Sequence, residues 1–508
     1  MKTFTSGLVA MVVLGAVACT AADEGPAPAA GVPGVTDLPP GADPGKAAPP
    51  PEPVTGVPGE DELTERYGVF VVEGGAEGAA GTRAEPMGSI QAAIDKAKAN
   101  KRRVYVCGGD YAEALTIESG VSVIGGYECA SKWMPGNKRA RLTAPTSPAV
   151  QARGIDRPTR LDGFEIVAPD GTAESRSSIA FIAERAAALT IARVELRAGR
   201  GANGVAGTTP APAVHTSSPH GAGHIPEVDP CALPTLNAAA RASCRQLGPG
   251  GPRPGAVGGT AACSAGPQPE SGGAGEGGDL YAAAQIWSLR GVGAAPELRS
   301  GAAGAEGVPG ASGSLGTFSA AGFATADGAR GGDGAAGAGG SGGAALHEIR
   351  WPFVDSNYRW ASTGGGGGAG GCAGLAGTPG TGGGASVALI AVDSAAMTLS
   401  EVALVAADGG DGGAGSFGSA PSDGGAPGAS LAAPSAQPGG RGGSAGVSGS
   451  GAGGPSVALA HTGGAPSQVR VQFTRGAGGR GVAELTSDRE PKTIPASSAG
   501  PSADILPF

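Results

Sequence analysis

Five carboxylates lie where short apolar runs predict β-structure, and paired carboxylates are the groups that cleave polysaccharides. They are Asp110, Glu113, Glu128, Asp162 and Glu165. Glycoside hydrolysis needs two carboxyl groups about 5–10 Å apart across a groove. Asp162 stands beside Gly163, as acids in turns do. We therefore expect solvated residues of turns and exposed faces, and we assign no catalytic residue.

Two further groups have the side chains of metal sites. Asp327, Asp333, Asp408 and Asp411 stand beside glycines, but the calcium-binding β-roll repeat also needs an aliphatic residue that is missing here. The histidines fall close together in a loop rich in Pro, Gly and Ser, at His215, His220 and His224. Since this loop fixes no ligand geometry, we expect a polar loop and assign no metal and no cofactor.

An aromatic cluster is the best candidate for binding. It consists of Trp351, Phe353, Tyr358 and Trp360. If exposed, these rings would form a platform for carbohydrate or another surface; if buried, they would fill a region that has few large side chains. We expect burial and keep carbohydrate or surface contact as the alternative.

The cysteines indicate export. An apolar run from Leu8 to Val17 follows Lys2, and small residues precede Cys19. This predicts a bacterial signal peptide over 1–18, with Cys19 as the lipidated residue and the membrane as partner through that lipid; an ordinary signal peptide is the alternative. The other six cysteines, an even number typical of disulfides, are Cys107, Cys129, Cys231, Cys244, Cys263 and Cys372. Cys107 and Cys129 are expected to pair across neighbouring strands, and the pairs Cys231–Cys244 and Cys263–Cys372 follow only by proximity.

Composition excludes one class of partner and raises one rival. The chain has 508 residues, 98 Gly, 42 Pro and a net charge of −9. A basic footprint for nucleic acid is missing, so no nucleic-acid partner is expected. The high Gly and Pro content is typical of disordered sequence, which remains an alternative for the glycine-rich parts.

Glycine recurs at every third position in three tracts. One runs from Gly301 to Gly316, another from Gly328 to Gly343, and a third from Gly368 to Gly383. A period of three matches the polyproline II-type helix, whose backbone groups need water or a neighbouring chain as partners. The tracts hold too little Pro for a collagen triple helix. They resemble the polyglycine II bundles of springtail antifreeze proteins and phage tail fibres, and in composition the repeats of mycobacterial PE-PGRS surface proteins.

Internal repetition predicts stacked coils between the glycine tracts. Residues 178–201 align without gaps onto 386–409, and a third copy begins at Ser456. Coils of this kind are stable only when stacked. The glycine tracts leave after the same strand of each copy and return before the same strand, so they should emerge on one side.

The start of the repetitive region resembles a known family. Residues 90–95 read Ile-Gln-Ala-Ala-Ile-Asp in an amphipathic helix that Ser89 can cap; 105–113 read Tyr-Val-Cys-Gly-Gly-Asp-Tyr-Ala-Glu, and 123–127 read Val-Ile-Gly-Gly-Tyr. These phrases resemble the opening of right-handed parallel β-helix proteins of the pectin-lyase-like superfamily. The resemblance covers about residues 67–200 and implies an all-β, right-handed parallel β-helix (solenoid) with an N-terminal capping helix. The glycine period adds polyglycine II-type insertions to this expected fold. Hydrolases of this fold carry Asp-Asp, Gly-His-Gly and Arg-Ile-Lys steps, and none occurs here.

The expected organisation has eight parts. In order they are a signal peptide (1–18), a Pro/Ala/Gly tether (19–60), the N-terminal part of the β-helix (61–204), a glycine-rich insertion (205–385), a coil (386–408), a second insertion (409–455), the last coil (456–490) and a tail (491–508). We expect an exported, lipid-anchored protein of the bacterial outer membrane or cell surface, non-catalytic, with a structural, adhesive or ligand-presenting role and a polysaccharide or another surface component as possible partner. A polysaccharide lyase or hydrolase and an ice- or surface-binding protein are the alternatives.

Overall fold

The fold was analysed in a computed structural model. It describes residues 56–508 except 77, 101–102, 132, 225–254, 275–290, 293–296, 345, 350–358, 431–433 and 489–490. The chain divides into two units, Met1–Pro49 and Pro50–Phe508, and every residue described here belongs to the second. Among the described residues, no helix combines the length and the apolar character needed to cross a membrane.

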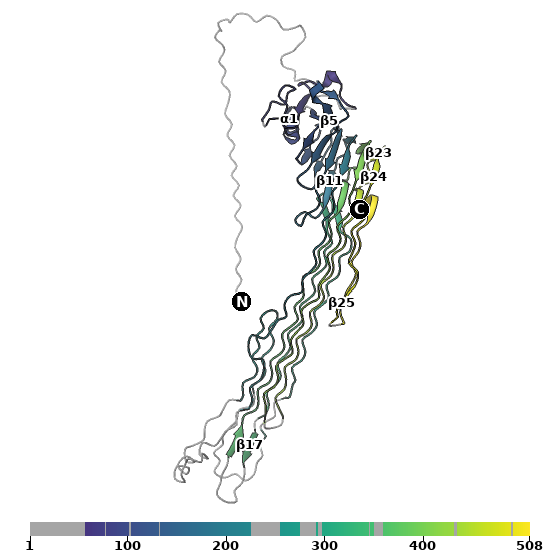
Figure 1. The fold of residues 1–508 in the computed structure, drawn as a ribbon. Coiled ribbons are helices and arrows are strands. Elements are labelled where there is room, and N and C mark those ends of the chain that lie inside the picture. Colours follow the sequence, from purple (N-terminus) through teal and green to yellow (C-terminus); the bar gives the residue numbers. More distant parts are fainter. Residues whose placement is uncertain are drawn as a thin grey trace, which may run out of the picture. The chain divides into compact units, whose positions relative to one another are not determined.

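Three sheets with parallel strands form the body (Figure 1). Sheet A runs β1 (Gly68–Val71), β2 (Arg103–Cys107), β5 (Val123–Glu128), β9 (Thr159–Asp162), β12 (Leu189–Ala192), β20 (Thr398–Ser400) and β23 (Ser467–Val469), with β6 (Met134–Pro135) antiparallel to β5. Sheet B runs β3 (Asp110–Tyr111), β7 (Ala140–Thr143), β10 (Phe164–Val167), β13 (Glu195–Arg197), β21 (Ala403–Val405) and β24 (Gln472–Thr474). Sheet C runs β4 (Leu115–Ile117), β8 (Val150–Arg153), β11 (Ser178–Glu184), β19 (Ser386–Val392), β22 (Ser456–Thr462) and β27 (Ser502–Pro507).

Successive strands visit the three sheets in turn, so that each repeat of the sequence stacks on the previous one. Ser178 lies opposite Ser386, and Ser386 lies opposite Ser456. This register is the one that the sequence repeat predicts. Apolar side chains from all three sheets meet in one buried core, which includes Leu161, Phe181 and Leu404. The protein is mostly β, and its stacked parallel sheets are compatible with a β-helix-like solenoid.

The remaining elements are small. Helix α1 spans Ile90–Asn100, and single 3₁₀ turns span Glu60–Glu62 (η1) and Cys129–Ser131 (η2). The antiparallel strands are β14 (Gly291–Val292), β17 (Leu346–Ile349) and β18 (Arg359–Ser362) in one sheet, β15 (Thr317–Ser319) with β16 (Gly322–Ala324), and β25 (Leu485–Thr486) with β26 (Thr493–Ile494).

Helix α1 follows the expected pattern of its sequence. Ser89 caps it by accepting a hydrogen bond from the Ala92 N–H at 3.2 Å. Ile90 and Ile94, one turn apart, are fully buried against the core. The helix contacts β1, β2 and β4, the strands at or near one end of the sheets.

The glycine-rich tracts pack together into a bundle. The name glycine-rich bundle is used below for the described residues of these segments: 198–224, 255–274, 297–316, 326–344, 363–385, 406–430, 434–455, 475–484 and 495–501. Its segments leave after the sheet B strands β13, β21 and β24 and return before the sheet C strands β19, β22 and β27, as the sequence predicts. Figure 1 follows them as parallel lines between the strands of the body and β17.

Backbone hydrogen bonds at every third residue hold the glycine-rich bundle together. Gly301, Gly304 and Gly307 donate to the carbonyl oxygens of Pro438, Arg441 and Ser444, all at 2.9 Å. The segment 326–344 runs the other way and donates to 297–316 in the same rhythm, for example from Ala335 to Ala305 at 2.8 Å. Backbone N–H and C=O groups of the bundle are therefore satisfied by hydrogen bonds between segments and not, as in an α-helix, within one segment.

Close backbone approach explains the glycines. A Cβ atom on Gly443 would lie 1.9 Å from the carbonyl oxygen of Ala305. In the same segment, a Cβ on Gly439 would lie 1.9 Å from the Ala369 carbonyl oxygen and one on Gly440 would lie 2.0 Å from that of Ala302. The three tracts predict close contact at every third position. The stretch 439–443 has glycine at two positions of three, and both sets of glycines lie against carbonyl oxygens of neighbouring segments.

One expected boundary differs in the structure. Residues 491–508 were expected to form a tail, yet Ser502–Pro507 is strand β27, which pairs with β22 in parallel. The strand stacks in the register of the earlier copies, with Ser502 opposite Ser456 and Ile505 opposite Leu459, but this likeness is too short to stand out as a repeat in the sequence.

Candidate functional site

A polar groove lies where the glycine-rich bundle meets sheet C. It has a volume of about 550 Å³ and lies between the loop at 173–177 and the β15–β16 hairpin. Arg176 is its central cation, and it donates to Asp327 at 3.1 Å, to Thr325 at 3.3 Å and to the Gly382 carbonyl oxygen at 3.3 Å. The carboxylate of Glu174 and the hydroxyl groups of serines complete the lining.

The acids of this groove are arranged for binding. Asp327 is ion-paired with Arg176 and also accepts the Gly382 N–H at 2.7 Å. The Asp327 carboxylate thus joins Arg176 to the backbone at Gly382 and is engaged within the protein. Hydroxyls, one cation and one further carboxylate can instead hydrogen bond to a polar ligand such as a sugar.

An apolar pocket lies on the other side of the same hairpin. Its volume is about 370 Å³, and its walls include Leu315, Leu506 and Phe508 together with hairpin side chains. The ring of Phe318 lies 5.0 Å from that of Phe323 and 5.3 Å from that of Phe508. Phe318 and Phe323 also pack against the apolar cluster that includes Ile179 and Ile182, so the hairpin is anchored to the outer face of sheet C.

Two of the carboxylates of the body are paired with arginines. Asp162, expected in a solvated turn, is fully buried and makes ion pairs with Arg160 at 2.7 Å and Arg193 at 2.5 Å. That expectation was wrong because Arg193 comes from the next coil, a contact that the local sequence Asp162-Gly163 does not contain. Glu165 faces Arg141 at 3.6 Å on an exposed surface.

Glu113 has a structural role that sequence reasoning missed. Its carboxylate accepts hydrogen bonds at the start of α1 from the Ile90 N–H at 2.6 Å, the Gln91 N–H at 3.0 Å and the Ser89 hydroxyl at 2.8 Å. A carboxylate at a helix N-terminus compensates the unsatisfied N–H groups and the helix dipole.

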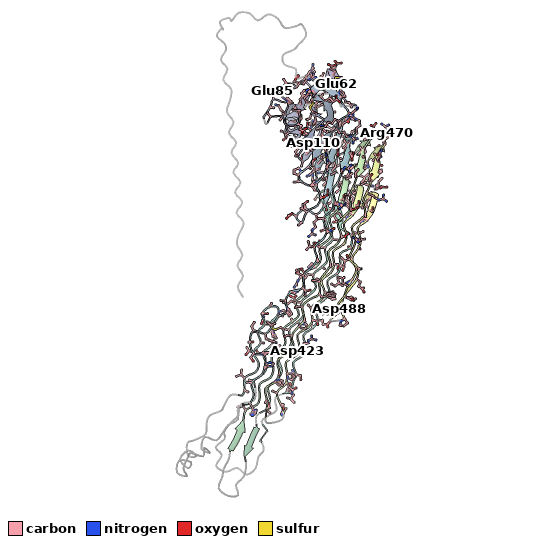
Figure 2. All side chains as sticks on the ribbon, viewed as in Figure 1. Glu62, Glu85, Asp110, Asp423, Arg470 and Asp488 are labelled. Carbon is pink, nitrogen blue, oxygen red and sulfur yellow. A yellow bond between two sulfur atoms is a disulfide. The ribbon has the colours of Figure 1, made fainter. Side chains whose placement is uncertain are left out.

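Other acids are spread over the whole protein. Figure 2 shows Asp110 on the body, whereas Asp423 and Asp488 lie along the glycine-rich bundle.

The aspartates of the glycine tracts join neighbouring segments. Asp333 accepts the Ala376 N–H at 2.7 Å, Asp408 accepts the Ala477 N–H at 2.8 Å, and Asp411 accepts the Arg480 N–H at 2.6 Å. Each carboxylate thus replaces a carbonyl oxygen as acceptor between two segments. A sequence signal existed, since these acids stand beside glycines in the same rhythm, but the partner segments are far away in the chain.

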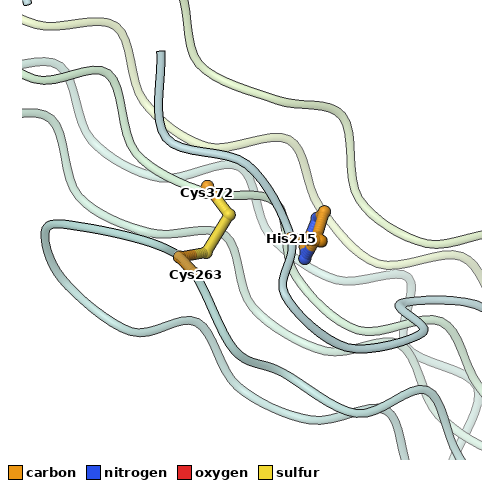
Figure 3. A group of neighbouring side chains, drawn as sticks. All are labelled: His215, Cys263 and Cys372. Atoms are coloured by element: carbon orange, nitrogen blue, oxygen red, sulfur yellow. A yellow bond between two sulfur atoms is a disulfide. The ribbon is translucent and has the colours of Figure 1, made fainter. Parts of the chain in front are cut away.

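The three histidines do not converge on one site. His220 accepts the Ala426 N–H at 3.0 Å, and His224 lies 3.1 Å from the Ala429 carbonyl oxygen. His215 alone meets cysteines: its side chain lies beside the Cys263–Cys372 disulfide (Figure 3).

Two of the expected disulfides are confirmed. Cys107 is bonded to Cys129, with Cα atoms 5.7 Å apart, and Cys263 is bonded to Cys372, with Cα atoms 5.9 Å apart. Cys107 ends β2, and Cys129 follows β5, the strand that pairs with β2. Cys231 and Cys244 lie outside the described residues, as does Cys19.

Most of the expected aromatic cluster also lies outside the described residues. Trp351, Phe353 and Tyr358 are not described, and the backbone of Trp360 is in β18 opposite Glu348 of β17. Whether these rings are exposed therefore stays a prediction. Comparison of the chain with protein-family models, with curated proteins and with solved structures finds no match.

Proposed function

We propose that this chain is an exported, lipid-anchored surface protein with a non-catalytic role: structural, adhesive or ligand-presenting. Its body is a right-handed parallel β-helix of the pectin-lyase-like kind, capped by α1 at one end, and the glycine-rich bundle is of the polyglycine II type. The carbohydrate of a neighbouring surface is the partner that its chemistry favours.

The construction of the glycine-rich bundle is the observation that carries this proposal. Its segments are held by backbone hydrogen bonds, such as Gly307 to Ser444 at 2.9 Å, and it needs few large side chains. Such a bundle can extend from a body without a hydrophobic core of its own. A bundle that extends from the body can present a binding surface at a distance from it. Catalysis in a groove of the body would not need such a bundle.

The chemistry of the body also favours binding over catalysis. Asp162 is held by two arginines and Asp327 by one. The polar groove around Arg176 offers hydrogen-bonding groups to a sugar, but the carboxylate of Asp327 in this groove is ion-paired with Arg176. A polysaccharide would thus be retained without being cut.

Display on the surface of a bacterium tests this function. Cells that carry the full chain are compared with cells that lack it for attachment to immobilised polysaccharides, and the supernatants are assayed for reducing ends and unsaturated sugars. We expect attachment without product. Weaker attachment when Trp351 and Trp360 are both changed to alanine would favour the exposed platform, which is the alternative for the aromatic cluster. Release of sugar product, or attachment equal to that of cells without the chain, would contradict the proposal.

The anchor is tested separately with a clickable palmitate analogue. Wild-type protein should be labelled and Cys19→Ala should not. Equal labelling of the two proteins would remove the membrane from the proposal and leave a secreted protein.

A further inference from the structure

His215, Cys263 and Cys372 bring one imidazole and two sulfur atoms together inside the glycine-rich bundle. A ring nitrogen of His215 and the two Sγ atoms all lie within 4.8 Å of one another. Cys372 is fully buried and Cys263 is 8% exposed. In Figure 3 the imidazole stands beside the sulfur–sulfur bond, and the three residues come from three separate passes of the chain.

The Cys263–Cys372 disulfide determines whether the cluster can bind a metal, because only the reduced cysteines can act as thiolate ligands. In the disulfide the sulfur lone pairs are poor donors, so the oxidised site has no thiolate to offer a metal. Reduction by two thiol molecules, which are themselves oxidised to one disulfide, adds two electrons and two protons and gives Cys263 and Cys372 as thiols. These thiols lose their protons when a divalent metal binds. We propose that the reduced form of this cluster is a binding site for a thiolate-preferring divalent cation such as Zn²⁺, with Cys263, Cys372 and His215 as ligands.

The backbone around the cluster is fixed without the disulfide. The Cys372 N–H donates to the Ser422 hydroxyl at 2.7 Å, and the Ser422 N–H donates back to the Cys372 carbonyl oxygen at 3.0 Å. The Cys263 backbone N–H donates to the side-chain oxygen of Gln268 at 2.8 Å, and the Cys263 carbonyl oxygen accepts from the side-chain amide of Gln268 at 3.2 Å. Both thiols should therefore remain close after the sulfur–sulfur bond is cut.

The strand-like pairing of His215 with Cys263 holds the third ligand. The Thr216 N–H donates to the Ala262 carbonyl oxygen at 2.9 Å, and the Ser264 N–H donates to the Val214 carbonyl oxygen at 2.9 Å. These two bonds flank the His215–Cys263 bridge on both sides. The imidazole is thus placed against the sulfurs by main-chain contacts that reduction does not touch.

The two nitrogens of the imidazole are differently placed. Nε2 lies 3.3 Å from the Ser422 hydroxyl and 3.4 Å from the Asp423 carbonyl oxygen. Nδ1 is buried and has no hydrogen-bond partner in the described part of the chain. Metal-bound histidines commonly donate their other ring N–H to a backbone carbonyl, which fixes the tautomer. Here Nε2–H would donate to Asp423 and leave the Nδ1 lone pair for the metal.

Charge and geometry both suit zinc. Two thiolates and a neutral imidazole around Zn²⁺ give a neutral complex, which a buried site tolerates far better than free thiolates. Zn–S bonds of about 2.3 Å in a tetrahedron put the sulfurs about 3.7 Å apart. Side-chain rotation can supply that separation because the two Cα atoms are 5.9 Å apart. The fourth position would be filled by water.

Cobalt spectroscopy on the full chain tests the site. The protein is reduced with a trialkylphosphine, which takes up the oxygen of a water molecule and leaves two thiols, and is then titrated with Co²⁺ without air. We expect a near-ultraviolet thiolate-to-cobalt band in the reduced protein only, lost in Cys372→Ser. Since loss of an outer partner of a metal ligand already costs 10–100-fold in affinity, His215→Ala should weaken Zn²⁺ competition by about 100-fold or more.

Matched variants make the outcome decisive. Changing Cys231 and Cys244 together to serine should leave the band unchanged, because the proposal names neither as a ligand. His220→Ala should also leave it unchanged, because His220 accepts the Ala426 N–H instead. Limited proteolysis of the reduced protein checks that the bundle stays folded. A reduced protein without the band, a band that survives Cys372→Ser, Zn²⁺ competition that is unchanged in His215→Ala, or a bundle that opens on reduction would each overturn the proposal.

Discussion

Gly307 lies so close to Gly332 that no larger residue fits: a Cβ atom on Gly307 would be 2.1 Å from the carbonyl oxygen of Gly332. The two residues belong to antiparallel segments of the glycine-rich bundle, and Gly332 donates to the Val308 carbonyl oxygen at 2.8 Å. Val308 itself is 75% exposed. The three-residue period thus separates positions that face a neighbour from positions that face solvent.

The buried ion pairs of Asp162 should matter for stability. Asp162→Asn leaves Arg160 and Arg193 without their carboxylate, and breaking a buried pair costs about 3–5 kcal/mol. Glu165→Gln is the matched control, because its pair with Arg141 is exposed and should contribute at most about 1 kcal/mol. Urea unfolding of both variants measures the difference. Equal midpoints would mean that Asp162 is solvated after all.

The helix cap made by Glu113 gives a smaller effect. Glu113→Gln removes the charge that faces three donors at the start of α1, and we expect a loss of about 1–2 kcal/mol in unfolding free energy. Glu118→Gln, which loses only a surface pair with Lys98 at 2.8 Å, should change little. If the two variants unfold at the same urea concentration, the contacts of Glu113 contribute nothing.

The strands and their register could largely be predicted from the sequence, whereas the contacts between distant segments could not. The copies that start at Ser178, Ser386 and Ser456 predicted which residues stack, because a coil can bury its apolar face only on its own repeat. The glycine rhythm likewise predicted a face that packs closely.

The candidate site depended on contacts that no local pattern encodes. Arg193 reaches Asp162 from another coil, and the hairpin of Phe318 and Phe323 docks on sheet C although its sequence lies between two glycine tracts. The partners of Asp327 and Asp333 lie in other segments of the bundle. Such pairings are set by how the segments pack around one another, which the chain order leaves open.

Buried tyrosines should make the protein sensitive to alkaline pH. Burial raises the pKa of Tyr127 above its ordinary value, so this group favours the folded state below the unfolded pKa of about 10 and that stability is lost as pH rises beyond it. Tyr127→Phe should move the midpoint of alkaline unfolding to higher pH. An unchanged midpoint would indicate that Tyr127 ionises freely in the folded protein.

The same residue is informative at neutral pH. In the described part of the chain the Tyr127 hydroxyl has no hydrogen-bond partner, so Tyr127→Phe should be nearly neutral. Tyr105→Phe is the comparison: it loses a bond to the Glu62 carbonyl oxygen at 2.9 Å and should cost about 1 kcal/mol. A larger loss for Tyr127→Phe than for Tyr105→Phe in urea unfolding would reverse this assignment.

The Cys107–Cys129 disulfide should stabilise the apolar cluster on the outer face of sheet A, in which Cys107 packs with Phe70, Tyr105 and Tyr127. It closes a sequence separation of 22, for which the chain-entropy relation gives about 3 kcal/mol. Changing both cysteines to serine should lower the urea midpoint accordingly, and peptide mapping without reductant should find the two joined. A fragment that joins Cys107 to another cysteine would contradict the strand pairing described here.

Limited proteolysis of two valine variants tests the glycine-rich bundle most directly. In Gly307→Val the side chain must push apart the segments at Gly332 and Gly446, whereas Ala305→Val adds its methyl groups at an exposed position of the same segment. We expect cleavage within 297–344 to be at least about tenfold faster in Gly307→Val than in wild type, and nearly unchanged in Ala305→Val. Equal, rapid cleavage of wild type and both variants would show that the glycine tracts are not packed against one another.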